Sequence, residues 1–327
     1  MESFEGKLAV VTGGGTGMGR ELCLALATAG ADVAMCDVSA DNMAETERLC
    51  QAAAPQAAIS CTVCDVADES AMLDFAQSVA KAHDTGHIDL LFNNAGIGGG
   101  GSFIEDERAD WDRTFGVCWN GVYNGCRAFV PMLTASAEGA LVNTSSVNGF
   151  WATLGPTTAH TAYSAAKFAV KGFTEALVND FRLHAPHVHV ALVMPGHVGT
   201  SIALNSSKVL GRGSALEMAA DTVAVARERM VRAGAPVGNL TDDQIRAILH
   251  QRALDFRDKA PLSAAGAAQI ILDGVKAKRW RILVGDDAVH LDAMVRADPE
   301  QAYEASFVER LTGDGHLQSL VTADPEE

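Results

Sequence analysis

The stretch Val10-Val-Thr-Gly-Gly-Gly-Thr-Gly-Met-Gly-Arg20 decides the fold, because it joins an apolar run to a helical pattern through a glycine-rich turn. Glycine lets the backbone turn tightly and approach a pyrophosphate. The N-terminus of the following helix offers unpaired N–H groups and a positive dipole end to that charge. Since strand, turn and helix stand in this order, the stretch predicts a dinucleotide-binding turn built on Gly13, Gly17 and Gly19.

Outward from this turn, short apolar runs alternate with helical patterns. We expect strands near 7–12, 32–37, 58–64, 88–92, 139–145 and 188–193, with helices between them. The strand candidates are continuously apolar, as strands covered by helices on both faces should be. The rhythm predicts an α/β fold with a doubly wound, Rossmann-type parallel sheet of about seven strands.

The alternation of strand and helix patterns stops after residue 200 and resumes only with a helix at 263–278 and a strand at 281–284. In the gap, Ser214–Glu217 and Thr241–Gln244 have capping-box spacing, which predicts helices near 215–233 and 242–258. Helices inserted beside a site often form a lid. We therefore expect one domain over 1–327, with a helical substrate lid at 201–262 and a C-terminal extension at 286–327 that carries a helix or two and a frayed end.

Composition narrows the class of protein. Hydrophobic residues make up 48% and charged residues 20%, as in ordinary globular proteins. The formal charge of −16 repels polyanions, so we expect no nucleic-acid partner and no membrane association. The polar start and the lack of 18 consecutive apolar residues predict a cytoplasmic protein. Seven cysteines, an odd number mostly on apolar faces, predict reduced buried thiols and no metal site.

Asp37 ends the second strand, 18 residues after Gly19, where its carboxylate can accept hydrogen bonds from the adenosine ribose hydroxyls. A 2′-phosphate there would meet like charge. Neither Thr16 in the turn nor Val38 after the aspartate supplies the cation that NADP needs. We therefore expect NAD as the cofactor and regard NADP as the less favoured one.

Two later strand ends offer further contacts. Asp65, followed by Val66, can reach the adenine edge or can equally cap the helix that begins near Glu69. In Asn93-Asn-Ala-Gly96, an Asn can lock strand ends while small residues admit the cofactor.

Tyr163 and Lys167 stand four residues apart, so on a helix they share one face. An ammonium beneath a phenol favours the ionised form and brings a pKa of about 10 toward the range of a general base. Downstream of a dinucleotide turn, the pair predicts a redox enzyme.

Six motifs in order resemble the short-chain dehydrogenase/reductase family in its single-domain branch. They are Thr12-Gly-x-x-x-Gly17-x-Gly19, Asn93-Asn-Ala-Gly96, Asn120, Ser146, Tyr163-x-x-x-Lys167 and Pro195-Gly-x-Val-x-Thr200. The resemblance covers residues 5–200 and resumes at 263–285, so the lid and the tail lie outside it.

The resemblance implies the catalytic roles. Tyr163 is the acid/base, and Lys167 lowers its pKa and holds the nicotinamide ribose. Ser146 hydrogen-bonds the substrate oxygen; Ser145 is its near rival, but the family usually uses the second serine of such a pair. Asn120 matches a helix Asn that orders water along a proton relay toward the lysine.

The resemblance also implies the cofactor site. Thr200 either hydrogen-bonds the nicotinamide carboxamide or stabilises its turn. The expected cofactor-binding residues are Gly13, Thr16, Gly17, Met18, Gly19, Asp37, Val38, Asp65, Val66, Asn93, Ala95, Gly96, Tyr163, Lys167, Pro195, Gly196, Val198 and Thr200.

The substrate side departs from the family pattern, because Ser146 and Tyr163 are 17 positions apart, more than is usual there. The added residues border the substrate. The candidate substrate residues are Trp151, Leu154, His160 and His197. The long, partly apolar lid favours a medium or bulky hydrophobic secondary alcohol or ketone.

We therefore expect an NAD-dependent alcohol dehydrogenase or carbonyl reductase. An NADPH-dependent carbonyl or 3-ketoacyl reductase is the alternative among enzymes, and a non-catalytic dinucleotide-sensing scaffold is the alternative of another class. The intact Ser, Tyr and Lys argue against the scaffold, which needs none of them. By analogy with the family, we expect a homodimer or homotetramer built through helices near 106–134 and 160–184.

Overall fold

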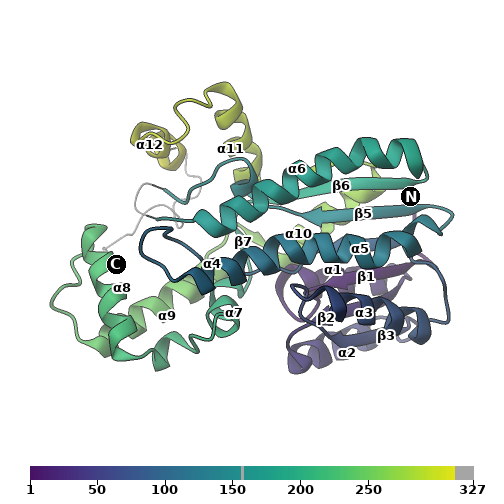
Figure 1. Ribbon diagram of the computed structural model, residues 1–327, viewed down its shortest axis with the longest axis horizontal. Helices are drawn as coiled ribbons and strands as arrows, with labels where there is room; N and C mark the ends of the chain where they lie inside the picture. The colour runs from purple at the N-terminus through teal and green to yellow at the C-terminus, as the bar shows by residue number, and fades with distance from the viewer. Residues whose placement is uncertain (156–157, 314–327) are drawn as a thin grey trace.

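Seven parallel strands form the central sheet of the computed structural model, which describes residues 1–155 and 158–313 (Figure 1). In chain order they are β1 (Leu8–Thr12), β2 (Asp32–Asp37), β3 (Ile59–Val63), β4 (Leu90–Asn93), β5 (Gly139–Thr144), β6 (Val188–Pro195) and β9 (Arg281–Val284). Their order across the sheet is β3-β2-β1-β4-β5-β6-β9. The predicted Rossmann-type α/β fold is confirmed. The strand order reverses between β1 and β4, and in such sheets ligands bind outside the carboxyl ends at this switch point.

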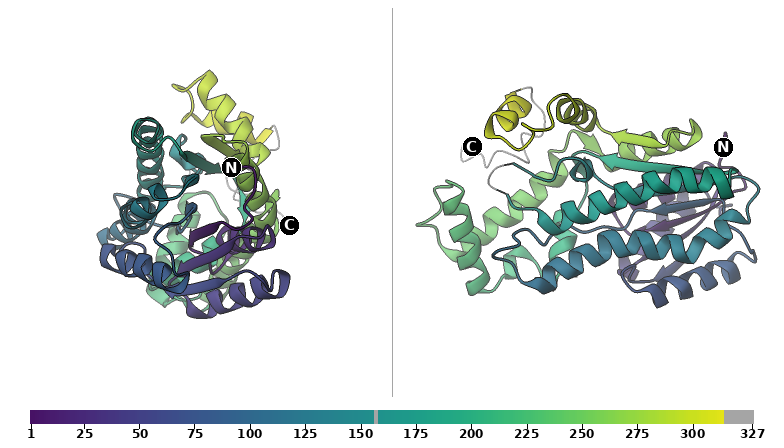
Figure 2. Two further views of the ribbon diagram at one scale, coloured as in Figure 1. Left: turned by 90° about the vertical axis from the view of Figure 1, so that its right-hand side faces the viewer. Right: turned by 45° about the horizontal axis from the view of Figure 1, so that its top comes forward.

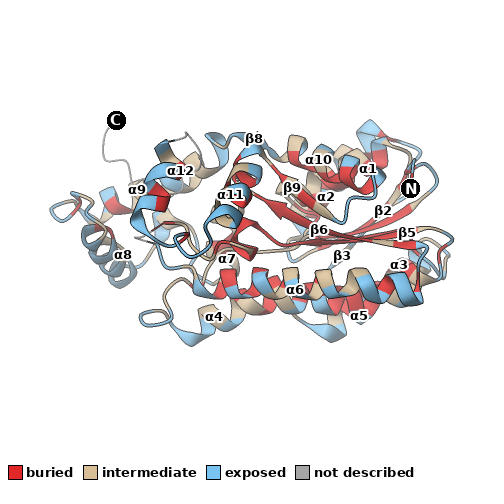
Figure 3. Ribbon diagram, turned by 90° about the horizontal axis from the view of Figure 1, so that it is seen from above, coloured by how far each residue is buried: buried red, intermediate tan, exposed pale blue. Residues whose placement is uncertain are grey.

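Helices cover both faces of the sheet (Figures 2 and 3). Alternate residues of β1 explain why: Ala9 and Val11 belong to one buried cluster, and Leu8 and Val10 to the other. Successive strand side chains point to opposite faces, so a strand covered on both sides must be apolar throughout. The first face packs on α1 (Gly17–Thr28), α2 (Ala40–Ala53) and α10 (Ala264–Lys276), and the second on α3 (Glu69–Ala82), α5 (Gly121–Thr134) and α6 (Thr161–His184).

The segment 201–262, which we call the lid segment, extends beyond the carboxyl edge of the sheet (Figure 1). Its helices are α7 (Ile202–Val209), the short 3-10 helix η3 (Ala215–Glu217), α8 (Ala220–Arg232) and α9 (Asp242–Asp258). The strands β7 (Val198–Gly199) and β8 (Leu262–Ser263) pair in parallel at its two ends.

The two capping predictions in the lid segment have different outcomes. Thr241 accepts a hydrogen bond from the N–H of Gln244, whose side chain accepts one from the N–H of Thr241, so the predicted capping box starts α9. The box predicted at Ser214 is wrong, because this serine caps only the short helix η3. The backbone is extended at Met218 and Ala219, and α8 begins one residue later.

The C-terminal extension carries α11 (Asp286–Ala297) and α12 (Ala305–Gly313), in agreement with the helix or two that we expect there. These helices pack on the body through a separate apolar cluster, whose buried members are Val147, Trp151, Ala288, Leu291, Ala302, Phe307, Val308 and Leu311. The expected frayed end, at 314–327, lies outside the described residues. Within the described part of the chain, no helix has the length and apolar character needed to cross a bilayer.

Candidate active site

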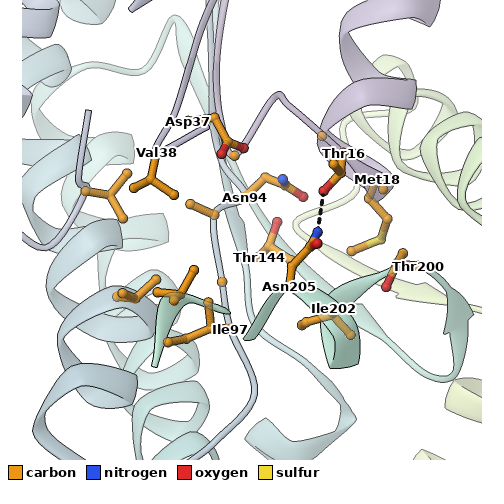
Figure 4. A pocket seen from close by; sticks show the side chains of 18 of the residues that line it. Thr16, Met18, Asp37, Val38, Asn94, Ile97, Thr144, Thr200, Ile202 and Asn205 are labelled. Atoms are coloured by element: carbon orange, nitrogen blue, oxygen red, sulfur yellow. Dashed lines mark hydrogen bonds between the residues drawn. The ribbon is translucent and has the colours of Figure 1, made fainter. Parts of the chain in front are cut away.

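A cavity of about 580 Å³ lies at the carboxyl ends of the strands, between the glycine-rich turn and the lid segment (Figure 4). The structure brings most of the predicted site residues to its wall. Those that line it are Gly13, Thr16, Gly17, Met18, Gly19, Asp37, Val38, Asp65, Val66, Ala95, Gly96, Ser146, Tyr163, Lys167, Pro195, Gly196, Val198 and Thr200.

The glycine-rich turn leaves no room for side chains. Gly13 and Gly17 have φ of +68° and +55°, which only glycine adopts readily, and a Cβ on Gly19 would lie 2.0 Å from the carbonyl oxygen of Gly13. The N-cap residue Thr16 makes no side-chain capping bond, so the first N–H groups of α1 remain open to an anion.

Asp37 is held in place at the end of β2. Its Oδ2 accepts from the N–H of Gly15 at 3.0 Å, and its Oδ1 accepts from the N–H of Ser39 at 3.1 Å. The fixed carboxylate faces the cavity beside the turn. Together, the open helix end, the glycine cradle and this acceptor fit a dinucleotide.

The two asparagines that follow β4 have different positions. Asn94 lines the cavity; its Nδ2 donates to the carbonyl of Thr12 at 3.1 Å, while its buried Oδ1 has no hydrogen-bond partner among the described residues. Asn93 donates to Asn143 Oδ1 at 2.9 Å and is buried between β4 and β5. The prediction that Asn93 contacts the cofactor is therefore wrong, because this side chain locks the two strands together.

Asp65 lines the cavity and does not cap a helix. The N-cap of α3 is Asp68, which accepts from the N–H groups of Ser70 and Ala71. Asp65 instead pairs with Arg113, at 2.6 Å between Oδ2 and Nη1. Arg113 comes from α4 (Arg108–Phe115) and also lines the cavity. Sequence spacing gave no signal for it, because it comes from a helix far along the chain.

Tyr163 and Lys167 lie together on α6, as predicted. The Lys167 ammonium is 5.4 Å from the centroid of the Tyr163 ring and donates to the carbonyl of Thr144 at 2.9 Å. Burial raises the pKa of Tyr163, the neighbouring Cys118 adds to this, and a hydrogen bond with Ser146 acts in the opposite direction. Burial also lowers the pKa of Lys167. The expected lowering of the phenol pKa by Lys167 is therefore not found, because loss of hydration dominates at this buried pair.

The two candidate serines both line the cavity but differ in their hydrogen bonds. Ser145 Oγ donates to the carbonyl of Lys167 at 2.8 Å, which commits its only proton. Ser146 Oγ accepts from the N–H of Asn148 at 3.1 Å and hydrogen-bonds with Tyr163, so its own proton is directed to the reacting phenol and not to the backbone. This difference favours Ser146 as the donor to a substrate oxygen.

Asn120 does not lie where the resemblance implies. It ends η1 (Gly116–Asn120), a π-helical turn between α4 and α5, and it is exposed and absent from the cavity wall. Cys118, one of the buried residues of this turn, donates from Sγ to the carbonyl of Ile97 at 3.2 Å and lies close enough to Tyr163 and Lys167 to affect the pKa of both. Residues two apart on a helix point about 200° apart, so only one of them can face the site.

None of the four candidate substrate residues is among those that line the cavity. Trp151 is 1% exposed and donates to the carbonyl of Ala302 at 2.7 Å, and His197 is 2% exposed with its Nε2 bonded to the carbonyl of Phe256 at 2.7 Å. Leu154 is half-buried and does not line the cavity either. Packing against the C-terminal extension accounts for Trp151 and packing against α9 accounts for His197, so these two predictions are wrong; the substrate role of Leu154 stays a prediction.

His160 remains close to the reacting groups. Its ring lies 4.7 Å from the Tyr163 ring, between centroids, and burial lowers its pKa to about 4. The imidazole is therefore neutral across the physiological range. Sequence reasoning missed several wall residues, among them Ile97, Val117, Ile202, Asn205, Lys208 and Phe256.

Comparisons with known proteins agree with this geometry. A family model described as short chain dehydrogenase matches residues 7–210. The chain is 36% identical to the putative oxidoreductase SadH of Mycobacterium tuberculosis over 296 residues, which are 90% of this chain and 92% of that protein. The structure of a short chain dehydrogenase/reductase from Burkholderia phymatum in complex with NAD has a TM-score of 0.74 and 30% identity, covering 93% of this chain and 98% of its own. A metagenomic short-chain oxidoreductase in complex with NADP has a TM-score of 0.53 and 32% identity, over 59% and 84%.

Proposed function

This chain belongs to the short-chain dehydrogenase/reductase family, an NAD(P)-dependent oxidoreductase family, and we propose that it interconverts a secondary alcohol and a ketone with NAD. The observation that carries the proposal is the meeting of Ser146, Tyr163 and Lys167 on one wall of a cavity whose opposite end is the glycine-rich turn. A dinucleotide-sensing scaffold would need none of these three side chains.

The protein residues act on the substrate oxygen. In the reducing direction, Tyr163 donates its phenol proton to the carbonyl oxygen, and the hydroxyl of Ser146 stabilises the charge that develops there. In the oxidising direction the phenolate takes the alcohol proton. The nicotinamide ring, when bound, supplies the hydride chemistry. When protonated, Lys167, 5.4 Å from the centroid of the Tyr163 ring, favours the ionised phenol as the proton leaves and so opposes the larger effect of burial.

The charge around Asp37 supports NAD as the cofactor. Asp41 also lines this part of the cavity, and a 2′-phosphate would meet both carboxylates. Arg113, the cation on the adenine side, is already paired with Asp65. A relative bound to NADP keeps an NADPH-dependent carbonyl or 3-ketoacyl reductase as the second candidate. Tenfold tighter binding of NADPH than of NADH would decide for that candidate.

The apolar part of the cavity wall supports a hydrophobic substrate. Its side chains come from η1, α7, α9 and the loop after β4 and include Ile97, Val117, Ile202, Val209 and Phe256. Apolar walls with a few placed polar groups are typical of small-molecule sites. We propose a medium or bulky hydrophobic alcohol or ketone, and we propose that the lid segment covers it.

The test is a panel of secondary alcohols of increasing apolar size, incubated with NAD and followed by NADH absorbance. We expect turnover to favour the larger members and to disappear in Tyr163→Phe. Turnover that is unchanged in this variant would contradict the mechanism, whichever substrate is used.

A homodimer or homotetramer through α4, α5 and α6 is also proposed. Trp119, Tyr123 and Phe173 form an aromatic group where α5 and α6 meet, and Tyr123 and Phe168 are 42% and 41% exposed. Exposed aromatic side chains of this kind are enriched at protein interfaces. Sedimentation of the wild type and of Phe168→Glu would test it, because the added charge should shift the distribution toward the monomer.

A further inference from the structure

We propose that α7 of the lid segment clamps the phosphates of the bound dinucleotide, with Lys208 as the cation that faces the pyrophosphate. The inference rests on the proposed use of NAD(P) and adds a binding role for the first helix of the lid segment.

Helix α7 is attached directly to the glycine-rich turn. Asn205 Nδ2 donates to Thr16 Oγ1 at 3.1 Å, a contact drawn in Figure 4. Just before the helix, Thr200 packs on the turn so closely that a Cβ on Gly17 would lie 3.2 Å from its side chain. Because a pyrophosphate binds at such a turn, α7 lies where it can cover one.

A second contact fixes the other side of the helix. Ser206 Oγ accepts from the N–H of Gly98 at 2.8 Å, in the segment that follows β4. The same hydroxyl donates to the carbonyl of Ile202 at 2.6 Å. Helix α7 therefore spans the cavity between the glycine-rich turn and the end of β4.

One face of α7 lines the cavity. Positions three, four and seven apart share a helix face, and the cavity-lining residues of α7 are Ile202, Asn205, Lys208 and Val209. Lys208 stands one turn beyond Asn205. Its flexible stem can bring the ammonium over the turn to which Asn205 is bonded.

The charges of the cavity wall single out Lys208. Of the other two cations there, Arg113 is paired with Asp65, and Lys167 is buried and bonded to the carbonyl of Thr144. Lys208 is exposed and forms no ion pair within residues 1–155 and 158–313, although the chain carries a net charge of −16. A lysine without an ion-pair partner in these ranges, next to a turn that can hold a pyrophosphate, fits an anionic ligand. Its ammonium can bind a phosphate as a point charge.

The test compares three ligands by calorimetry on the full chain. NADH and ADP-ribose contain the pyrophosphate, whereas adenosine does not. In Lys208→Gln we expect the Kd of NADH and of ADP-ribose to rise about tenfold, with adenosine unchanged, because one charge-assisted contact is lost. The slope of log Kd against log salt should also fall. Asn205→Ala, which releases α7 from the turn, should act in the same direction.

Lys81→Gln on α3, an exposed lysine away from the cavity, is the matched control and should leave every Kd within twofold. An unchanged Kd for NADH in Lys208→Gln would overturn the proposed clamp. An equal loss of affinity for adenosine and for NADH would overturn it as well. A higher KM for substrate with an unchanged Kd for NADH would instead assign Lys208 to the substrate. Wild-type protein that is folded but binds neither NADH nor NADPH would refute the proposed function itself, and the clamp with it.

Discussion

The carboxylate of Asp287 accepts a hydrogen bond of 2.6 Å from the backbone N–H of His197, and so binds the C-terminal extension to the turn that follows β6. The contact is close, since a Cβ on Gly196 would lie 2.3 Å from the same carboxylate. On its other side, the His197 ring bonds to the carbonyl of Phe256 in α9. Extension, turn and lid segment therefore meet at Pro195 and Gly196, which line the cavity.

Replacing Asp287 by Ala should destabilise the protein. The buried N–H of His197 would lose its acceptor, and an unsatisfied buried donor costs about 1–3 kcal/mol of the free energy of unfolding. Urea denaturation measures the loss. The exposed Asp298→Ala is the control, with an expected change of about 0.5 kcal/mol or less. Equal stability of the two variants would show that the contact does not hold the turn.

The two serines should differ in their effect on turnover. Ser146→Ala removes the hydroxyl that hydrogen-bonds with Tyr163 and should lower kcat by about 10²–10³-fold, the usual loss for an oxyanion donor. Ser145→Ala removes a bond to the Lys167 carbonyl and should cost less. Steady-state kinetics, with NADH binding as the check on folding, separate them. A larger loss in Ser145→Ala would reverse our assignment.

The pH dependence should differ between the two directions of the reaction. Burial raises the pKa of Tyr163, so the phenol stays protonated at neutral pH and the phenolate that accepts the alcohol proton is scarce. For alcohol oxidation, kcat/KM should therefore rise steadily from pH 7 to pH 10. Ketone reduction, which uses the protonated phenol, should be flat over neutral pH and fall only in strong alkali. An oxidation rate that levels off below pH 7 would contradict the raised pKa.

Salt should loosen the lid segment. Arg229 pairs with Asp106 at 2.6 Å, Arg232 pairs with Glu105, and Arg212 pairs with Asp110, so three arginines hold the lid segment to residues 105–110. Single exposed pairs contribute little, about 0–1 kcal/mol each, and are screened by salt.

Amide hydrogen exchange in α8 measures this loosening. It should become faster in about 0.5 M NaCl, where the screening length falls to a few ångströms. Arg229→Gln should show the same increase at low salt, whereas Arg48→Gln, which breaks a pair inside α2, should not. Exchange in α8 that is insensitive to both salt and Arg229→Gln would show that apolar packing alone holds the lid segment.

The sequence alone determined the features that depend on local backbone geometry. The turn at residues 10–20, the strand rhythm and the i, i+4 spacing of Tyr163 and Lys167 all follow from hydrogen-bond periodicities and from glycine's conformational freedom. The capping box at Thr241 belongs to the same class, since both of its partners lie within one helical turn. These features could be predicted because the residues that cause them are neighbours in the chain.

Only the tertiary structure decided which side chains face the cavity. The π-helical turn η1 buries Cys118 and exposes Asn120, and α11 and α12 enclose Trp151, which was a reasonable substrate candidate by position. Arg113 reaches Asp65 across 48 positions, and Lys208 reaches the cavity from the lid segment. Contacts of this kind come from packing between distant segments, whose free energy depends on shape and burial in three dimensions and leaves no fixed spacing along the chain.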